Sequence, residues 1–482
     1  MKLDPLDKPQ GKLPTEALTV VQLPPERAVQ EAFLRNLQLA IRPKASLLAL
    51  PPAARPDTFF IPQPLADLLR GNFGRSWERT LKDWGALSVN PMPVDAYASL
   101  AMHSAALAAD AASAKLSALS PPSAAPGRAA LDWHIGPGGV NAVAAWRMFA
   151  DRGDRAPPWT AVTIGHIDTG YSEHAALGWA AGASATVQPS RGEDFYDESL
   201  YGRPRRDDPR DEWIAPYQGH GTRISATIAG KLELAGGAGF YGAAPQATVI
   251  PYRVTDSVIV DHVRHLLARA IRQAVDDGCQ VINVSLGALL GSQRLASAID
   301  CAYERGVIVV CAAGQVIRWV IHPGCYNRCV TMAGIGPDRS PWAASAHGRT
   351  VDLAAPADGI RRVRAEFLPP GQTAASLEPR ADGDGTSYAT ALCSGAAALW
   401  LAWHGVDALR ERYRASGAWQ IPAAFKWLAC QSAARGGFDP HDEEYGAGVL
   451  DIPALLRLPL PADGALHKAE VADGPFDRNE RP

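Results

Sequence analysis

Residues 280–314 read QVINVSLGALLGSQRLASAIDCAYERGVIVVCAAG, and this stretch decides the fold class. A short β-branched run, QVINVSLG, is followed by an amphipathic segment from Gln293 to Arg305 and then by a second apolar run, GVIVVCAAG. These patterns predict a strand, a helix and a second strand. Two buried strands joined by a helix predict a parallel pair with the helix packed on one face of the sheet.

The same alternation continues on both sides of this stretch. TAVTIGHIDTG (160–170) and ATVIPYRVTD (247–256) read as strands, and helical spacing runs from Val260 to Asp277 and again after Ser387. We therefore expect an α/β domain in which a central, mostly parallel sheet is flanked by helices on both faces. In such sheets, functional groups gather at the carboxyl ends of the strands.

Composition divides the chain into three regions. Residues 1–130 hold Pro-rich joints between short helical patterns and end in LSALSPPSAAPGRAA, which is typical of an exposed Ser/Pro/Ala linker. This region is predicted to be mainly helical or irregular. Residues 131–460 are predicted to form the α/β domain. Residues 461–482 are polar and lack periodicity, and are predicted to be a mobile C-terminal tail.

Charge and hydropathy exclude several kinds of partner. The chain has 482 residues, and its 47 basic and 50 acidic side chains give a net charge of -3. This balance gives no reason to expect a nucleic-acid partner. We see neither a Sec-type signal peptide near the first residues nor a membrane span. The localisation stays open between the cytoplasm and export by a route without a Sec signal peptide.

The cysteines predict neither a disulfide framework nor a metal site. Seven cysteines, an odd number, are scattered along the chain, and most are expected to be reduced and buried. Cys325 and Cys329 could form a small loop disulfide or supply half of a metal site. Because no second cysteine pair completes a tetrahedral shell, no metal site is predicted.

Three segments carry residue types suited to catalysis. VTIGHIDTG places Asp168 at the end of an apolar strand, GHGTRISATIAG places His220 between two glycines, and GDGTSYATALCSGAAALW places Ser387 at the start of an apolar helix. A helix start offers unpaired N–H groups and a positive dipole to a developing oxyanion. Taken singly, each residue has an ordinary alternative: a turn aspartate, a loop histidine and a helix-capping serine.

Together, the three segments resemble a known family. Their order is Asp, His, Ser, the order found in subtilisin, and IDTG, GHGT and GTSYAT resemble the active-site signatures of the subtilases. The resemblance continues through YGAAPQATVIPYRV, VINVSLG, SAHGRTVDLAAPADGI and YGAGVLDI, and it covers about residues 131 to 456. It implies a three-layer subtilisin-like fold and a serine endopeptidase.

The resemblance assigns roles to individual residues. Ser387 would attack the scissile carbonyl, His220 would take and return the proton, and Asp168 would orient the imidazole. Protein or peptide would be the substrate, and the chemistry would need no cofactor. Two strands would bind an extended peptide and line its P1 pocket: Ser285, Leu286 and Gly287, and Ala312, Ala313 and Gly314.

The sequence departs from the family pattern at three places. Gln315 stands where subtilases usually carry an Asn that completes the oxyanion hole, which predicts slow or restricted turnover. Ala391 replaces a usual Pro, with little expected consequence. A structural calcium site has no specific support, because arginines interleave with the candidate acidic ligands and salt bridges between the two sets are favoured. The acids are Glu193, Asp194, Asp197, Asp207, Asp208 and Asp211, and the arginines are Arg203, Arg205, Arg206 and Arg210.

Two alternatives stay open. Residues 1–130 could act as a pro-segment that assists folding and inhibits the domain intramolecularly, or as a targeting or partner-binding region. The chain could also be a subtilase-fold binding or scaffolding protein with little or no proteolytic turnover, because Gln315 leaves the catalytic power open.

Overall fold

The computed structural model describes most of the chain from residue 132 onward. It describes 132–474 except 155, 181–182, 197–207, 212–216, 235–238, 262, 316–318, 367–370 and 436–442, and only parts of 18–92 before that. The predicted linker before residue 131 and the last eight residues lie outside the described residues, so the predicted boundary near residue 130 stays a prediction.

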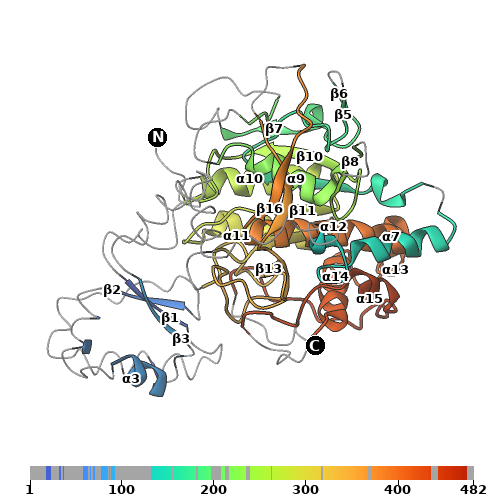
Figure 1. Cartoon of the computed structure of the whole chain (residues 1–482). Coiled ribbons are helices and arrows are strands. Elements are labelled where there is room, and N and C mark those ends of the chain that lie inside the picture. Colours follow the sequence, from blue (N-terminus) through green and yellow to red (C-terminus); the bar gives the residue numbers. More distant parts are fainter. Residues whose placement is uncertain are drawn as a thin grey trace.

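A seven-stranded sheet forms the centre of the described domain (Figure 1). Its order is β14-β13-β12-β11-β4-β10-β7, and every neighbouring pair is parallel. The strands are β4 (Thr163–Asp168), β7 (Glu193–Asp194), β10 (Thr248–Arg253), β11 (Val281–Val284), β12 (Ile308–Ala312), β13 (Val330–Ile335) and β14 (Leu353–Pro356). Their apolar runs are buried on both faces, as a parallel sheet requires.

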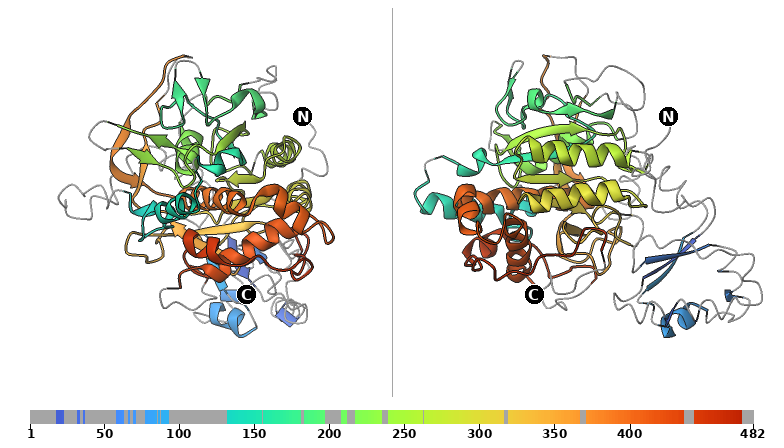
Figure 2. Two further views of the ribbon diagram at one scale, coloured as in Figure 1. Left: turned by 90° about the vertical axis from the view of Figure 1, so that its right-hand side faces the viewer. Right: turned by 180° about the vertical axis from the view of Figure 1, so that it is seen from behind.

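Helices cover both faces of this sheet and make the domain three-layered (Figure 2). One apolar cluster joins the sheet to α10 (Arg264–Asp276) and α11 (Gln293–Glu304), which lie side by side. The larger cluster joins it to α7 (Ala142–Asp151), α9 (His220–Ala229), α12 (Thr386–His404), α14 (Gln420–Ser432) and α15 (Ile452–Arg457). The predicted α/β architecture is confirmed.

Shorter elements complete the domain. After α12 the chain forms two further helices, α13 (Val406–Arg412) and α14, with a turn between them. Three two-stranded sheets and three 3-10 turns lie outside the central sheet: β5 (Trp179–Ala180) with β6 (Ala183–Ser184), β8 (Lys231–Leu232) with β9 (Phe240–Tyr241), β15 (Ile360–Val363) with β16 (Leu377–Gly383), η4 (Trp133–Ile135), η5 (Pro158–Ala161) and η6 (Pro189–Arg191).

The described part of the N-terminal region contains strands that the sequence analysis did not predict. β1 (Leu18–Gln22) pairs antiparallel with β2 (Thr58–Pro62) on one side and β3 (Ser88–Met92) on the other. One helix, α3 (Trp77–Asp83), precedes β3. The Pro-rich joints obscured the strands, because β2 and β3 each contain a proline that a central strand would not tolerate.

Residues 461–474 correct the expectation of a mobile C-terminal tail for this stretch. Ala472 is fully buried, and its N–H donates to Asp300 at 2.9 Å. Arg328 donates to the carbonyls of Ala469 and Glu470 at 3.0–3.2 Å, and Asn327 donates to that of Val471 at 3.2 Å. The stretch has no periodicity because side chains of the main domain, rather than a helix or strand of its own, satisfy its backbone.

The cysteines and the apolar helices behave as ordinary parts of the domain. All seven cysteines are free thiols, so Cys325 and Cys329 do not form the loop disulfide. In the part of the chain that the structure describes, no single helix has the length and apolar character to span a membrane. α12 and α13 meet that criterion only as a pair, and the pair is bent by 73°.

Candidate active site

The carboxyl end of β4 holds the first predicted site residue. Asp168 is the last residue of this strand and is 1% exposed. Its Oδ1 accepts hydrogen bonds from the N–H of Thr169 and from the Nδ1 of His220, both at 2.7 Å. The strand end therefore fixes the carboxylate in a buried position with one face toward the imidazole.

The glycines around His220 allow a close passage of the backbone. His220 is the first residue of α9, and Gly219 before it has a φ of 67°, which glycine adopts without strain. A side chain at Gly221 would overlap the carbonyl oxygen of Gly170, just after β4. The two glycines thus bring the start of α9 against the end of β4.

Ser387 lies in the first turn of α12. Gly385 has a φ of 148° and turns the chain sharply into the helix, which begins at Thr386. The N–H groups of a first turn have no intrahelical acceptors and form the positive end of the helix dipole. Nearly the whole of α12 is buried, Ala391 included, so Ser387 is held on a rigid element.

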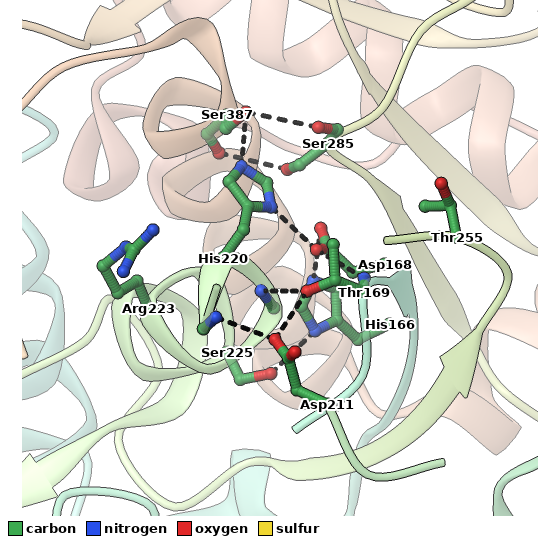
Figure 3. Close-up of polar contacts among 12 residues, drawn as sticks. His166, Asp168, Thr169, Asp211, His220, Arg223, Ser225, Thr255, Ser285 and Ser387 are labelled. Carbon is green, nitrogen blue, oxygen red and sulfur yellow. Dashed lines mark hydrogen bonds and ion pairs between the residues drawn. The ribbon is translucent and has the colours of Figure 1, made fainter. Parts of the chain in front are cut away.

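The three side chains form a continuous hydrogen-bonded row (Figure 3). His220 Nδ1 lies 2.7 Å from Asp168 Oδ1, and its Nε2 lies 3.3 Å from Ser387 Oγ. The last distance is slightly long for a hydrogen bond, as is common before a substrate tightens the site. Ser387 Oγ also lies 3.2 Å from the carbonyl oxygen of Ser285, so its single proton can be donated either to that carbonyl or to His220 Nε2.

A second imidazole contacts the same aspartate, and the sequence analysis missed it. His166 Nε2 lies 3.3 Å from Asp168 Oδ2, and both side chains are 1% exposed. His166 Nδ1 lies 2.7 Å from Ser225 Oγ on α9 (Figure 3). The available signal was strand periodicity, because residues two apart on β4 point to the same face. Asp168 therefore sits between two histidines, one on each oxygen.

The surroundings of Asp168 favour its charged form. Burial by itself raises the pKa of this carboxyl, because it disfavours a charge. The neighbouring His220, which is hydrogen-bonded to the carboxylate, and the nearby His166 together outweigh burial and hold the pKa well below its ordinary value. The carboxylate thus stays ionised where a histidine titrates.

Asp211 ties the loops around this row together. Its Oδ2 accepts from the hydroxyl of Thr169 at 3.0 Å and from the N–H of Gly219 at 2.8 Å. The same hydroxyl accepts from the N–H of Gly221 at 3.1 Å. One buried carboxylate therefore links the segment after Asp168 to the turn that carries His220.

Gln315 lies beside the start of α12. Its Oε1 accepts the N–H of Thr386 at 3.2 Å, and its backbone bridges to Ser345. A hydrogen bond to Oε1 leaves the Nε2 amide hydrogens as the outward donors of the side chain. The Gln315 side chain thus contacts the N–H of the residue that precedes Ser387.

The two predicted substrate strands border Ser387, but several of their main-chain groups are already engaged. Gly287 exchanges hydrogen bonds at 2.9 Å with Val258 and Val260. The N–H of Ala313 donates to the carbonyl of Met332, and its carbonyl accepts from the N–H of Ile321. The Gly314 carbonyl accepts from the N–H of Ala346 and from the hydroxyl of Thr386. Leu286 is buried in the core, and Ala312 is the last residue of β12. A peptide pairing with Gly287, Ala313 or Gly314 would share or displace these contacts.

Some of the acidic residues considered as calcium ligands form ion pairs with arginines. Arg253 contacts Asp194 at 2.7 Å, with both side chains buried, and Arg210 contacts Glu173 at 2.7 Å and Asp208 at 3.4 Å. Five of the candidate residues lie outside the described residues: Asp197, Arg203, Arg205, Arg206 and Asp207. Among the residues that are described, no three His, Cys, Asp or Glu side chains gather as a metal site would require.

Comparison with known proteins assigns the chain to a family. The model of the subtilase family matches residues 160–448, which is more than half of the chain and contains the whole hydrogen-bonded row. The chain therefore belongs to the subtilase family of serine endopeptidases.

Several relatives share this domain. Thermitase of Thermoactinomyces vulgaris is 31% identical over 38% of this chain and 60% of its own length. Mycosin-1 of Mycobacterium tuberculosis is 29% identical over 62% of this chain and 69% of its own length. Subtilisin Savinase of Lederbergia lenta is 30% identical over 49% of this chain and 75% of its own length.

Solved structures share the fold. A protease from Pseudoalteromonas arctica superposes with a TM-score of 0.50 at 24% identity, covering 67% of this chain and 96% of its own. MycP1 from Mycobacterium smegmatis has the same TM-score at 21% identity, covering 73% of this chain and 91% of its own. At these identities the likeness concerns the fold alone.

Proposed function

We propose that the chain hydrolyses peptide bonds through Asp168, His220 and Ser387. The observation that carries the proposal is the unbroken row from the Asp168 carboxylate through the imidazole to the serine hydroxyl. Each of these side chains comes from a different element, so an ordinary turn, loop or capping role does not account for their meeting at one point.

The steps follow from the geometry. Ser387 Oγ attacks the scissile carbonyl while His220 Nε2 takes its proton, and His220 then protonates the leaving amine as the C–N bond breaks. Water, deprotonated by the same imidazole, hydrolyses the acyl-enzyme and restores the serine. Asp168 keeps Nδ1 protonated and stabilises the imidazolium. Every proton is returned within the cycle, so the chemistry needs no cofactor.

Gln315 is proposed to supply the side-chain donor of the oxyanion hole. Its Oε1 is held by the Thr386 N–H, which directs Nε2 away from that contact, and the Ser387 N–H supplies the second donor. Gln is one methylene longer than Asn, so its amide has an additional rotor to fix. We therefore expect turnover that is slow or restricted rather than absent.

Covalent labelling tests the proposal. A fluorophosphonate probe reacts only with an activated serine, so the wild-type chain, labelled after an incubation that would allow it to release residues 1–130, should become labelled and the Ser387→Ala variant should not. A protein that kept the subtilase fold only for binding or scaffolding would give no labelling in either. Labelling that persisted in Ser387→Ala would also reject the assignment of the nucleophile.

The role of residues 1–130 is tested by intact mass. We propose that they act as a pro-segment that inhibits the domain until it is cleaved, since they precede the catalytic domain and end in a predicted linker. Incubation of the full chain should then release a fragment by a cut near residues 117–135 in wild type but not in Ser387→Ala. Unchanged mass in a chain that does label would favour the targeting or partner-binding alternative.

A further inference from the structure

Ile321 is anchored between the two strands that border Ser387. Its N–H donates to the carbonyl of Ala313 at 3.0 Å. The next residue, His322, exchanges two backbone hydrogen bonds with Ala288, at 2.8 and 2.9 Å. The backbone at Ile321 is therefore fixed on both sides by the strands that hold Gly287 and Gly314.

The Ile321 side chain fills the space beside both glycines. A methyl group placed on Gly287 would overlap Cδ1 of Ile321, and one placed on Gly314 would lie 2.9 Å from the same atom. The two glycines and the isoleucine thus form one interlocked contact. Since Ile321 is only half-buried, this contact borders solvent rather than the centre of the core.

The two segments that make this contact also hydrogen-bond to the start of α12, which carries the proposed nucleophile. The Ser285 carbonyl, two residues before Gly287, accepts the Ser387 hydroxyl at 3.2 Å. The Gly314 carbonyl accepts the hydroxyl of Thr386, the residue before the nucleophile, at 3.3 Å. These two segments are the ones that the sequence analysis predicts to line the P1 pocket, so a substrate side chain next to the bond under attack would enter the space between them. Ile321 already occupies that space.

We propose that Ile321 closes the P1 pocket, so that the enzyme cleaves after small residues such as Ala, Gly or Ser and rejects Leu and aromatic residues. The proposal rests on the proposed function, because it concerns the same nucleophile. Small P1 side chains fit above the isoleucine, whereas larger ones would need to displace Cδ1. Moving the Ile321 side chain would cost free energy, because backbone hydrogen bonds hold Ile321 and His322 to both strands.

The test measures kcat/KM on chromogenic peptides that differ only at P1, with Ala, Leu or Phe. Wild type should prefer Ala. A single methylene in an apolar pocket changes kcat/KM by about 10- to 200-fold. The ratio of Phe to Ala should therefore rise at least about tenfold in Ile321→Ala, with Ile321→Val between it and wild type. Val406→Ala, a half-buried aliphatic truncation on α13, should leave the ratio unchanged.

The outcomes separate this proposal from the proposed function. A wild-type enzyme that labels with fluorophosphonate and cleaves after Phe as well as after Ala would overturn the role of Ile321 alone. An unchanged ratio in a folded, labelled Ile321→Ala variant would do the same. No labelling and no hydrolysis of any peptide by wild type would overturn both.

Discussion

The two sides of Ser387 are built from opposite kinds of chemistry. The proton-transfer side consists of His166, Asp168, His220 and Ser225, joined by contacts of 2.7–3.3 Å. The pocket side consists of Gly287, Gly314 and Ile321, which meet only through apolar contact. One side is fixed by charge and hydrogen bonds, the other by the absence of side chains on two glycines.

This difference teaches how reaction and selectivity are divided. If the proposed function holds, polar geometry on the proton-transfer side sets what chemistry takes place, and its members come from strand and helix ends whose positions the sheet fixes. Packing on the proposed pocket side would then set which substrates reach that chemistry. Substitutions on the first side should lower kcat, and those on the second should redistribute kcat/KM among substrates.

Loss of the imidazole should give the largest effect. His220→Ala removes the base that activates Ser387, and in subtilisin the equivalent loss lowers kcat by about 10⁶-fold. We expect a fall of similar order with KM nearly unchanged, measured on the peptide with Ala at P1. A loss below about tenfold would mean that proton transfer does not run through this side.

The oxyanion donor should come next. Gln315→Ala is expected to lower kcat by about 10²- to 10³-fold, the scale of the corresponding subtilisin variant. Gln315→Glu is a nearly isosteric control that removes the amide donor and adds a negative charge, so it should be at least as impaired. Activity that survived both substitutions, with Gln315→Asn also neutral, would remove Gln315 from the oxyanion hole.

The second imidazole should have a smaller effect. The contact between His166 Nε2 and Asp168 Oδ2 is 3.3 Å long and weaker than a good hydrogen bond to a charged group, which contributes about 1.5–3 kcal/mol, so His166→Leu should lower kcat by at most about tenfold. Because His166 touches only Asp168 and Ser225 in this row, KM should not change. His166 would therefore act by positioning Asp168. His166→Gln retains an N–H donor and should recover part of the loss, whereas equal losses in both variants would indicate a packing role only.

The smallest effect should concern the pH dependence of stability, away from both sides. Burial, with Arg152 and Arg412 nearby, lowers the pKa of His404 to about 4. An ordinary histidine titrates near pH 6.5, so the unfolded chain takes up this proton first. The contribution of neutral His404 to the free energy of unfolding is therefore fully present above about pH 6.5 and is lost as the pH drops toward about 4.

His404→Gln tests this assignment. The decline in Tm between pH 7 and pH 5 should be smaller in the variant than in wild type by about 2–4 °C. The pH dependence of kcat should not change, since His404 lies at the far end of α12 from Ser387. An equal decline in both proteins would place the acid sensitivity in other groups.

A large part of the fold and of the site could be predicted from the sequence. Strand and helix periods around residues 280–314 predicted the parallel sheet, because burial on both faces leaves an unbroken apolar run. The short motifs around Asp168, His220 and Ser387 predicted the row only when taken together, because their order and sequences resemble the active-site signatures of the subtilases. The N-terminal strands and the docked stretch 461–474 escaped prediction, because prolines obscured the first and contacts distant in sequence hold the second.

What the sequence determined by itself is the kind of chemistry: residue types at strand and helix ends, with glycines that permit close approach, are local properties of the chain. What only the tertiary structure decided is the surroundings of that chemistry. His166 faces Asp168, and Ile321 covers Gly287 and Gly314, only because separate segments are brought together by the sheet. Packing between distant segments has no local sequence period, and so it appears only once the chain is folded.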